Sequence, residues 1–136
     1  HSILGMEKAL SIAMNHLEED RNYIESLKLY FISELKNLSE KIQFNGLSFN
    51  LDKSSFTILN VRFPVMNAML LFSLDMAGIA VSGGSACQSG SNKGSHVLAE
   101  ILNDTDADKT SVRFSFSKFT TKEEVDITVS KLKKLL

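Results

Sequence analysis

The sequence has a single cysteine, Cys87, among its 136 residues. One cysteine excludes an internal disulfide, and it leaves no two-cysteine spacing that could hold a zinc ion. Because structural disulfides are typical of oxidising compartments, their exclusion favours a reducing, cytoplasmic setting. We therefore expect a free thiol and no metal centre.

An excess of charge of one sign is also missing, as is any long apolar run. Fifteen Lys and Arg against 16 Asp and Glu give a formal net charge of -1, and the basic residues are dispersed, which argues against a nucleic-acid partner. No apolar run approaches the roughly 20 residues of a membrane span, and the first residues lack a signal-peptide pattern. We expect a soluble protein that binds neither nucleic acid nor membrane.

Proline and glycine are absent from Met6 to Leu38. Apolar residues recur there in steps of three, four or seven, the pattern of one helical stripe: Met6, Leu10, Ala13, Leu17, Ile24, Leu27, Phe31, Leu35 and Leu38. The length leaves two possibilities. The helix breaks near Asp20 to Asn22, or it is one long helix that packs on more than one partner.

Four of the seven glycines and five serines lie between Ser82 and Ser95, around Cys87. This composition predicts a mobile loop over 82–95, because Gly and Ser offer little apolar area to offset the entropy of ordering. Two readings of Cys87 remain open on spacing alone: an incidental surface thiol, or a reactive one displayed on the loop. His96 follows the loop, and a place at a helix start is favoured over a catalytic role.

The other elements follow from periodicity and turn residues. We expect weak strands at Ile42 to Phe44 and Ser48 to Leu51, a strand from Thr57 to Phe63, a helix from Asn67 to Ala77, a buried strand from Ile79 to Val81 and a helix from Val97 to Leu102. Ser111 to Ser117 alternates as a strand that shows Arg113 on the face opposite its apolar residues. A final helix begins with a capping box, Thr120 with Glu123 or Thr121 with Glu124. Together these predict an α+β domain with a small, largely antiparallel sheet covered by helices, preceded by a long linking helix.

Two blocks of sequence resemble a known family. The first is SGGSACQSGS, followed by SHVL, and the second is SVRFSFSKFTTKEEVD, Ser111 to Asp126. They are similar, in the same order, to the active-site loop and the final strand and helix of the group I (NifS/IscS-like) cysteine desulfurases, within the class V aminotransferase family.

The resemblance implies a function for both residues singled out above. Cys87 would be the catalytic nucleophile that takes sulfur from L-cysteine as a persulfide, leaving L-alanine, and Arg113 would bind the substrate carboxylate. The family uses pyridoxal 5'-phosphate on a fold type I scaffold, acts as a homodimer and passes sulfur to an acceptor or scaffold protein, as in iron-sulfur cluster assembly. Without the resemblance, a surface ion pair would be the favoured reading of Arg113.

The resemblance also implies that a domain is missing from this chain. Residues 1–38 would link to an absent cofactor-binding large domain, and 39–136 would form the C-terminal small domain with the cysteine loop 82–95. The family's Schiff-base lysine has no counterpart here, since Lys93 and Lys118 lack its context, so we expect no cofactor-binding residue in this chain. Gly94 stands where many relatives have proline. Two other functions remain open: a selenocysteine lyase, or a non-enzymatic thiol relay and interaction module.

Overall fold

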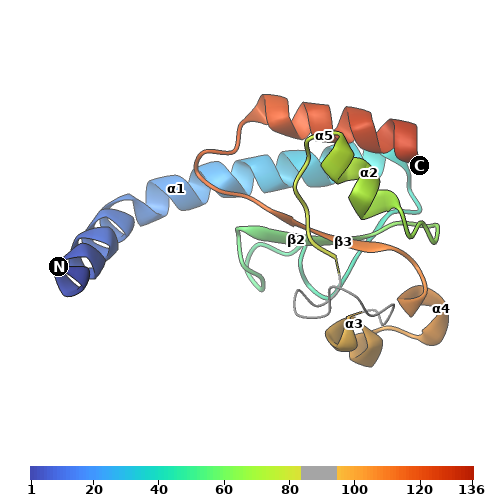
Figure 1. Cartoon of the computed structure of the whole chain (residues 1–136), viewed down its shortest axis with the longest axis horizontal. Coiled ribbons are helices and arrows are strands. Elements are labelled where there is room, and N and C mark those ends of the chain that lie inside the picture. The colour runs from blue at the N-terminus through green and yellow to red at the C-terminus, as the bar shows by residue number, and fades with distance from the viewer. Residues whose placement is uncertain (84–94) are drawn as a thin grey trace.

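The computed structural model describes residues 1–83 and 95–136, so Cys87 and most of the predicted loop 82–95 lie outside the described residues. The elements follow in the order α1 (Ser2–Leu38), β1 (Gln43–Phe44), β2 (Ile58–Arg62), α2 (Leu70–Met76), α3 (His96–Ile101), α4 (Asp104–Ala107), β3 (Ser111–Ser115) and α5 (Lys122–Leu135). Figure 1 shows α5 beside the second half of α1, with the sheet below them and α3 and α4 beyond it.

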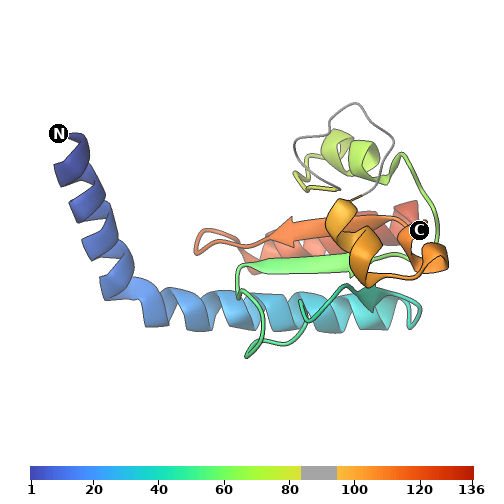
Figure 2. The same cartoon turned by 90° about the horizontal axis from the view of Figure 1, so that it is seen from below.

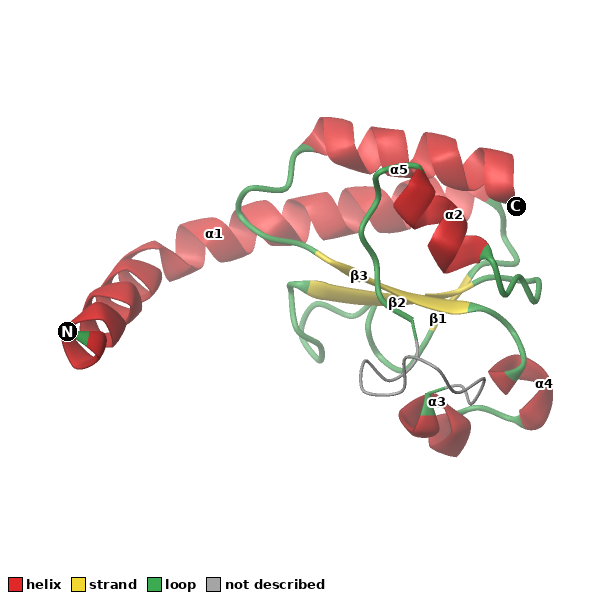
Figure 3. Ribbon diagram, in the orientation of Figure 1, coloured by secondary structure: helices red, strands yellow, loops and turns green. Residues whose placement is uncertain are grey.

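The three described strands form an antiparallel sheet in the order β1-β2-β3. Leu59 pairs with Phe114 and Val61 with Val112, and all four side chains are buried. Because side chains alternate along a strand, this register turns one face of the sheet to the core and leaves the other face to polar residues. Figure 3 shows the helices grouped around these short strands, and the predicted α+β class is confirmed.

The core lies between the sheet, α1 and α5. The second half of α1 supplies Ile24, Leu27, Phe31, Ile32 and Leu35, and α5 supplies Val125 and Leu132. The Phe31 ring meets the Phe114 and Phe116 rings edge-on, with centroids 4.9 and 5.9 Å apart, a geometry that aromatic pairs favour. The sheet and both helices therefore share a single apolar core.

Helix α1 is continuous, so of the two possibilities the single long helix is found, without a break near Asp20 to Asn22. Its first half leaves the body of the domain and bends away from it (Figure 2). The apolar residues of that half are exposed, with 75% of Met6, 59% of Leu10 and 62% of Met14 accessible. The predicted stripe is thus buried only along the second half of the helix.

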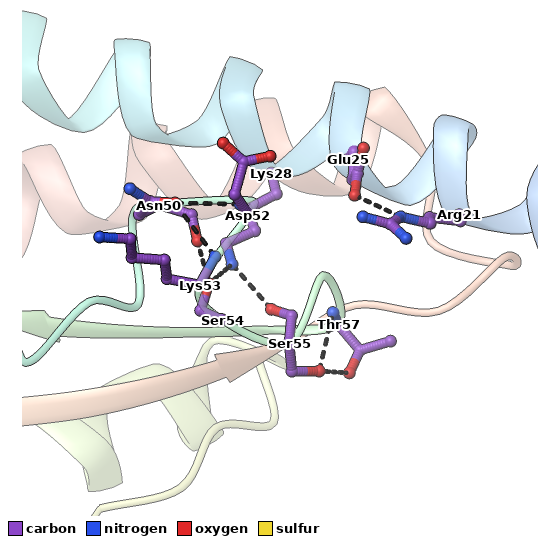
Figure 4. Close-up of polar contacts among 9 residues, drawn as sticks. All are labelled: Arg21, Glu25, Lys28, Asn50, Asp52, Lys53, Ser54, Ser55 and Thr57. Carbon is purple, nitrogen blue, oxygen red and sulfur yellow. Dashed lines mark hydrogen bonds and ion pairs between the residues drawn. The ribbon is translucent and has the colours of Figure 1, made fainter.

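Lys28 on α1 is fully buried, which the sequence analysis did not predict. Its ammonium donates to Ser54 Oγ at 3.1 Å and to the Ser55 carbonyl at 2.8 Å (Figure 4). Burial lowers the pKa of Lys28, with the charge of Glu25 opposing the shift. These bonds fix the segment before β2 against the helix.

Two predicted strands are wrong, and one helix was missed. Ser48 to Leu51 forms turns, in which the Ser48 amide donates to the Asn45 carbonyl. Ile79 to Val81 is not a strand because the Ile79 amide closes the end of α2 on Leu74, after Gly78 at φ +80°. The missed helix, α4, starts at Asn103, which caps the Asp106 amide.

Both predicted helix caps are found in the C-terminal half. Ser95 caps α3 by accepting from the Leu98 amide. The capping box of α5 is the second of the two pairs considered: Thr121 accepts from the Glu124 amide, and the Glu124 carboxylate accepts from the Thr121 amide. These bonds satisfy amides that a helix start leaves without partners. The capping box therefore sets the start of α5 after the segment that follows β3.

Candidate functional site

Arg113 lies in the middle of β3 with its side chain exposed, while Val112 and Phe114 on either side are buried. The predicted display of Arg113 on the polar face of the sheet is confirmed. Its side chain has no hydrogen bond or ion pair with residues 1–83 or 95–136. A guanidinium offers five donors in a planar fork, and no residue in these two ranges accepts from this one.

The chain leading to Cys87 runs beside Arg113. The Arg113 amide donates to the Ser82 carbonyl at 2.7 Å, and the Ser82 amide donates to the Arg113 carbonyl at 3.2 Å. The next residue, Gly83, packs so closely on α2 that a Cβ there would lie 2.7 Å from Leu71 Cδ2. Ser82 thus fixes one end of the cysteine-bearing segment to the strand that carries Arg113.

A polar cluster lies on the sheet next to Arg113. Asn60 is the Cα partner of Arg113 across β2 and β3. Its Oδ1 accepts from Asn45 Nδ2 at 2.8 Å, and the same Nδ2 donates to Ser111 Oγ at 2.9 Å. Asn45 is 4% exposed, and Asn60 is half-buried. Buried amides need such partners, because an unmet donor or acceptor costs about 1 to 3 kcal/mol.

Arg62 extends this cluster to α4. One Nη donates to Asn45 Oδ1 at 2.9 Å, and the other lies 3.3 Å from Asp106 Oδ2. Lys109 Nζ donates to Asp106 Oδ1 at 2.8 Å. The Lys109 hydrogen bond, aided by the charge of Arg62, lowers the pKa of Asp106. Asp106 is therefore an anchor that stays ionised and holds Arg62 in place.

Sequence reasoning missed Asn45, Asn60 and Arg62, although one signal was present. In the strand TILNVRF, Asn60 and Arg62 occupy the positions between the buried residues Leu59, Val61 and Phe63. They must share a face with each other and, once β2 and β3 pair, with Arg113. Their pairing with Asn45 depends on a turn that the sequence does not specify.

The remaining predicted positions are at the edges of the site. His96 is exposed at the start of α3, next to the Ser95 cap, as its structural reading predicts. Lys93 and Gly94 lie outside the described residues. Lys118 contacts Asp20 at 3.4 Å. Lys28 is the only fully buried lysine among the described residues. Its ammonium is already bonded to the Ser54 hydroxyl and the Ser55 carbonyl, on the α1 side of the sheet, so it does not fit the role of a lysine that holds the cofactor.

A pocket of about 400 Å³ lies beside the end of β3 and the first half of α5. Phe31, Phe116 and Val125 line it, together with the segment Ala77 to Val81. Arg113 and Asn60 are not among the residues that line it. The polar cluster is therefore a surface of the sheet rather than a part of this cavity.

The structure is that of a small domain in which Ser82, five residues before Cys87, pairs with Arg113 on β3. Residues 1–128 match the aminotransferase class-V family, and the chain belongs to that family. Among curated relatives, a protein from Pseudoalteromonas translucida named "Cysteine desulfurase IscS" is 35% identical over 133 residues, covering 98% of this chain and 32% of its own length. One of the same name from Buchnera aphidicola is 37% identical over 129 residues, covering 95% and 31%.

Solved structures agree with this assignment. A structure titled "NIFS-LIKE PROTEIN" matches with a TM-score of 0.77 at 28% identity, over 98% of this chain and 32% of that one. A NifS-like protein from Rickettsia africae shares the fold, with a TM-score of 0.70 at 18% identity, over 91% of this chain and 31% of its own. The resemblance to the NifS/IscS-like group is confirmed, and the chain spans about a third of the length of the relatives it matches.

Two further findings concern membrane spans and metal sites in the part of the chain that the structure describes. No helix there has the length and apolarity needed to cross a membrane. Nor do the His, Asp and Glu residues of that part gather in a group of three that could hold a metal ion.

Proposed function

We propose that the chain is the C-terminal part of a pyridoxal-phosphate-dependent cysteine desulfurase, which converts L-cysteine to L-alanine through a persulfide on Cys87. The observation that carries the proposal is the pair of backbone bonds between Ser82 and Arg113. This pair of bonds brings Arg113, whose guanidinium could bind an anion, close to the start of the segment that bears the only thiol. The likeness to proteins named cysteine desulfurase supports the same reading.

Arg113 binds the substrate carboxylate in this proposal. Its guanidinium can donate to both carboxylate oxygens at once, which fixes the orientation as well as the position of the amino acid. Lysine has no such fork and would act only as a point charge. No residue in 1–83 or 95–136 uses this fork, which is consistent with a role in binding the substrate.

Cys87 acts as the nucleophile. Its thiolate attacks the sulfur of cysteine, a sulfur-sulfur bond forms, the carbon-sulfur bond breaks, and the carbon takes up a proton to give alanine. The thiolate is required because the neutral thiol reacts poorly, and an ordinary cysteine has a pKa near 8.5. The persulfide then passes its outer sulfur to an acceptor or scaffold protein, in iron-sulfur cluster assembly or a related pathway.

The cofactor, when bound, supplies the electron sink for breaking the carbon-sulfur bond. None of this chain's described lysines fits as its anchor, so we assign its binding to a large domain N-terminal to residues 1–38, with 39–136 as the small domain. The complete enzyme is proposed to be a cytoplasmic homodimer. The chain described here would be inactive alone.

The test is alanine production by the complete protein from L-cysteine, compared with L-selenocysteine. Alanine from cysteine, lost in Cys87→Ser, supports the proposal. A strong preference for selenocysteine would instead indicate a lyase for that amino acid. Transfer of sulfur from an added persulfide donor, without alanine from either amino acid, would indicate a thiol relay.

A further inference from the structure

We propose that Asn60 is a second carboxylate donor, which binds the same substrate carboxylate as Arg113; this inference rests on the proposed function. Both Arg113 backbone groups bond to Ser82, so they point away from β2. Arg113 and Asn60 therefore form a pair without backbone hydrogen bonds, the type in which Cα atoms lie about 4.5 Å apart and side chains are close. The two side chains leave the same face of the sheet side by side.

The orientation of the Asn60 amide is set by a charged group at the far end of the cluster. Arg62 has only donors, so it turns Asn45 Oδ1 toward itself. Asn45 therefore donates from its Nδ2 to Asn60, and the atom of Asn60 that accepts is Oδ1. Asp106 holds Arg62 from behind. Each amide can therefore face only one way.

This chain of bonds leaves Asn60 Nδ2 directed away from Asn45. Nδ2 has no hydrogen-bond acceptor among residues 1–83 and 95–136, and neither has Arg113. A carboxamide nitrogen and a guanidinium beside each other are both donors, so neither can satisfy the other. An anion that accepts from both would satisfy each of them, and a carboxylate has two oxygens for the purpose.

Asn60→Asp is the sharpest variant. Aspartate keeps an oxygen for Asn45 and nearly the same shape, but it replaces the free donor by an acceptor and places a negative charge beside Arg113. Asn50→Asp is the matched control, because its Oδ1 only accepts, from the Asp52 and Lys53 amides on the loop beside α1. Both variants add the same charge to the protein.

The measurement is calorimetric binding to the complete, cofactor-loaded protein of L-alanine and of L-alaninamide, which lacks the carboxylate. We expect Asn60→Asp to weaken L-alanine binding at least about tenfold and L-alaninamide less than about twofold, since a hydrogen bond to the carboxylate is lost and a like charge is placed beside it. Asn50→Asp should change neither. Should Asn60→Asp fail to fold, Asn60→Ser is measured by the same criteria.

An unchanged affinity for L-alanine, or an equal loss for both ligands, would overturn the inference, because Asn60 would then support the fold rather than the carboxylate. A complete protein that makes no alanine from cysteine, yet shows the selective loss in Asn60→Asp, would refute the desulfurase proposal and still support the carboxylate site. The two failures are therefore distinguishable.

Discussion

Ser82 and Arg113 are joined by two backbone hydrogen bonds of 2.7 and 3.2 Å. Ser82 lies five positions before Cys87 in the sequence, and Arg113 lies on β3, whose next residue, Phe114, packs on Phe31 in the core. The contacts of the core thus continue along β3 to Ser82, at the start of the cysteine segment. In our proposal, β3 therefore carries the arginine that binds the carboxylate and also holds the start of the segment that bears the thiol.

Replacing the thiol separates binding from chemistry. In the complete enzyme, Cys87→Ser should keep its affinity for the cofactor and for cysteine but make no alanine, because only the atom that attacks sulfur has changed. Absorbance titration with cofactor and an alanine assay would be compared with those of the unchanged enzyme. Full turnover in the variant would show that Cys87 is an incidental surface thiol.

Changing the arginine tests orientation rather than charge. Arg113→Lys should lower kcat/KM for cysteine by about tenfold to a hundredfold, equivalent to about 1.4 to 2.8 kcal/mol, since lysine cannot pair with both carboxylate oxygens. Steady-state kinetics on the complete enzyme would measure it. Lys118→Arg makes the opposite exchange at a residue that contacts Asp20 and should have little effect. An unchanged kcat/KM in Arg113→Lys would assign the arginine to the surface.

The sequence was sufficient where a single local rule decides the structure. The alternation around Arg113 predicted its exposed face, and Thr121 with Glu124 predicted the start of α5. It was insufficient where distant residues decide. Ile79 to Val81 is apolar enough for a strand, but the Ile79 amide is taken by Leu74. The orientation of the Asn60 amide depends on Asn45, 15 positions away, whose Nδ2 donates to Asn60 Oδ1.

The capping box should contribute measurably to stability. Thr121→Ala removes the side chain that accepts from the Glu124 amide, and losing such a cap costs about 1 kcal/mol, within about 0.5 to 2. Urea unfolding followed by helical circular dichroism would measure the change. Ser130→Ala, at an exposed position further along α5, is the control. Equal stability of both variants would show that α5 depends on its apolar face alone.

Lys28 should make the stability rise with pH. Its pKa is lowered by burial, so in alkaline solution the folded state releases this proton before the unfolded state does, and unfolding takes up a proton. The free energy of unfolding therefore gains from Lys28 as pH rises toward the ordinary lysine pKa of about 10.4.

Lys28→Met has no such gain. As pH rises from about 7 to about 10, the unchanged chain should therefore become more stable relative to the variant. Tyr30, whose pKa is raised to about 12 by its hydrogen bond to Asp126, acts in the opposite direction but equally in both proteins. Urea unfolding across this pH range would measure the difference. A difference independent of pH would mean that Lys28 is hydrated.

The chain by itself should fold but associate through α1. Its core is formed by the sheet, α2, α5 and the second half of α1. The first half of α1 instead exposes Met6, Leu10 and Met14 and extends away from the rest of the domain. Exposed apolar stripes of this kind mark surfaces that another protein surface covers. In our proposal the cofactor-binding domain covers this stripe, so the isolated chain should neither bind pyridoxal phosphate in a saturable way nor make alanine.

Size-exclusion chromatography with light scattering should show that the isolated chain forms a species larger than its 15.1 kDa. The double variant Leu10→Gln with Met14→Gln should return it to a monomer. Leu29→Gln removes an apolar side chain that is 50% exposed on the second half of α1 and should leave the association unchanged. A monomeric unchanged chain that gains a saturable visible band with the cofactor and releases alanine from cysteine would show that the chemistry does not need the absent domain.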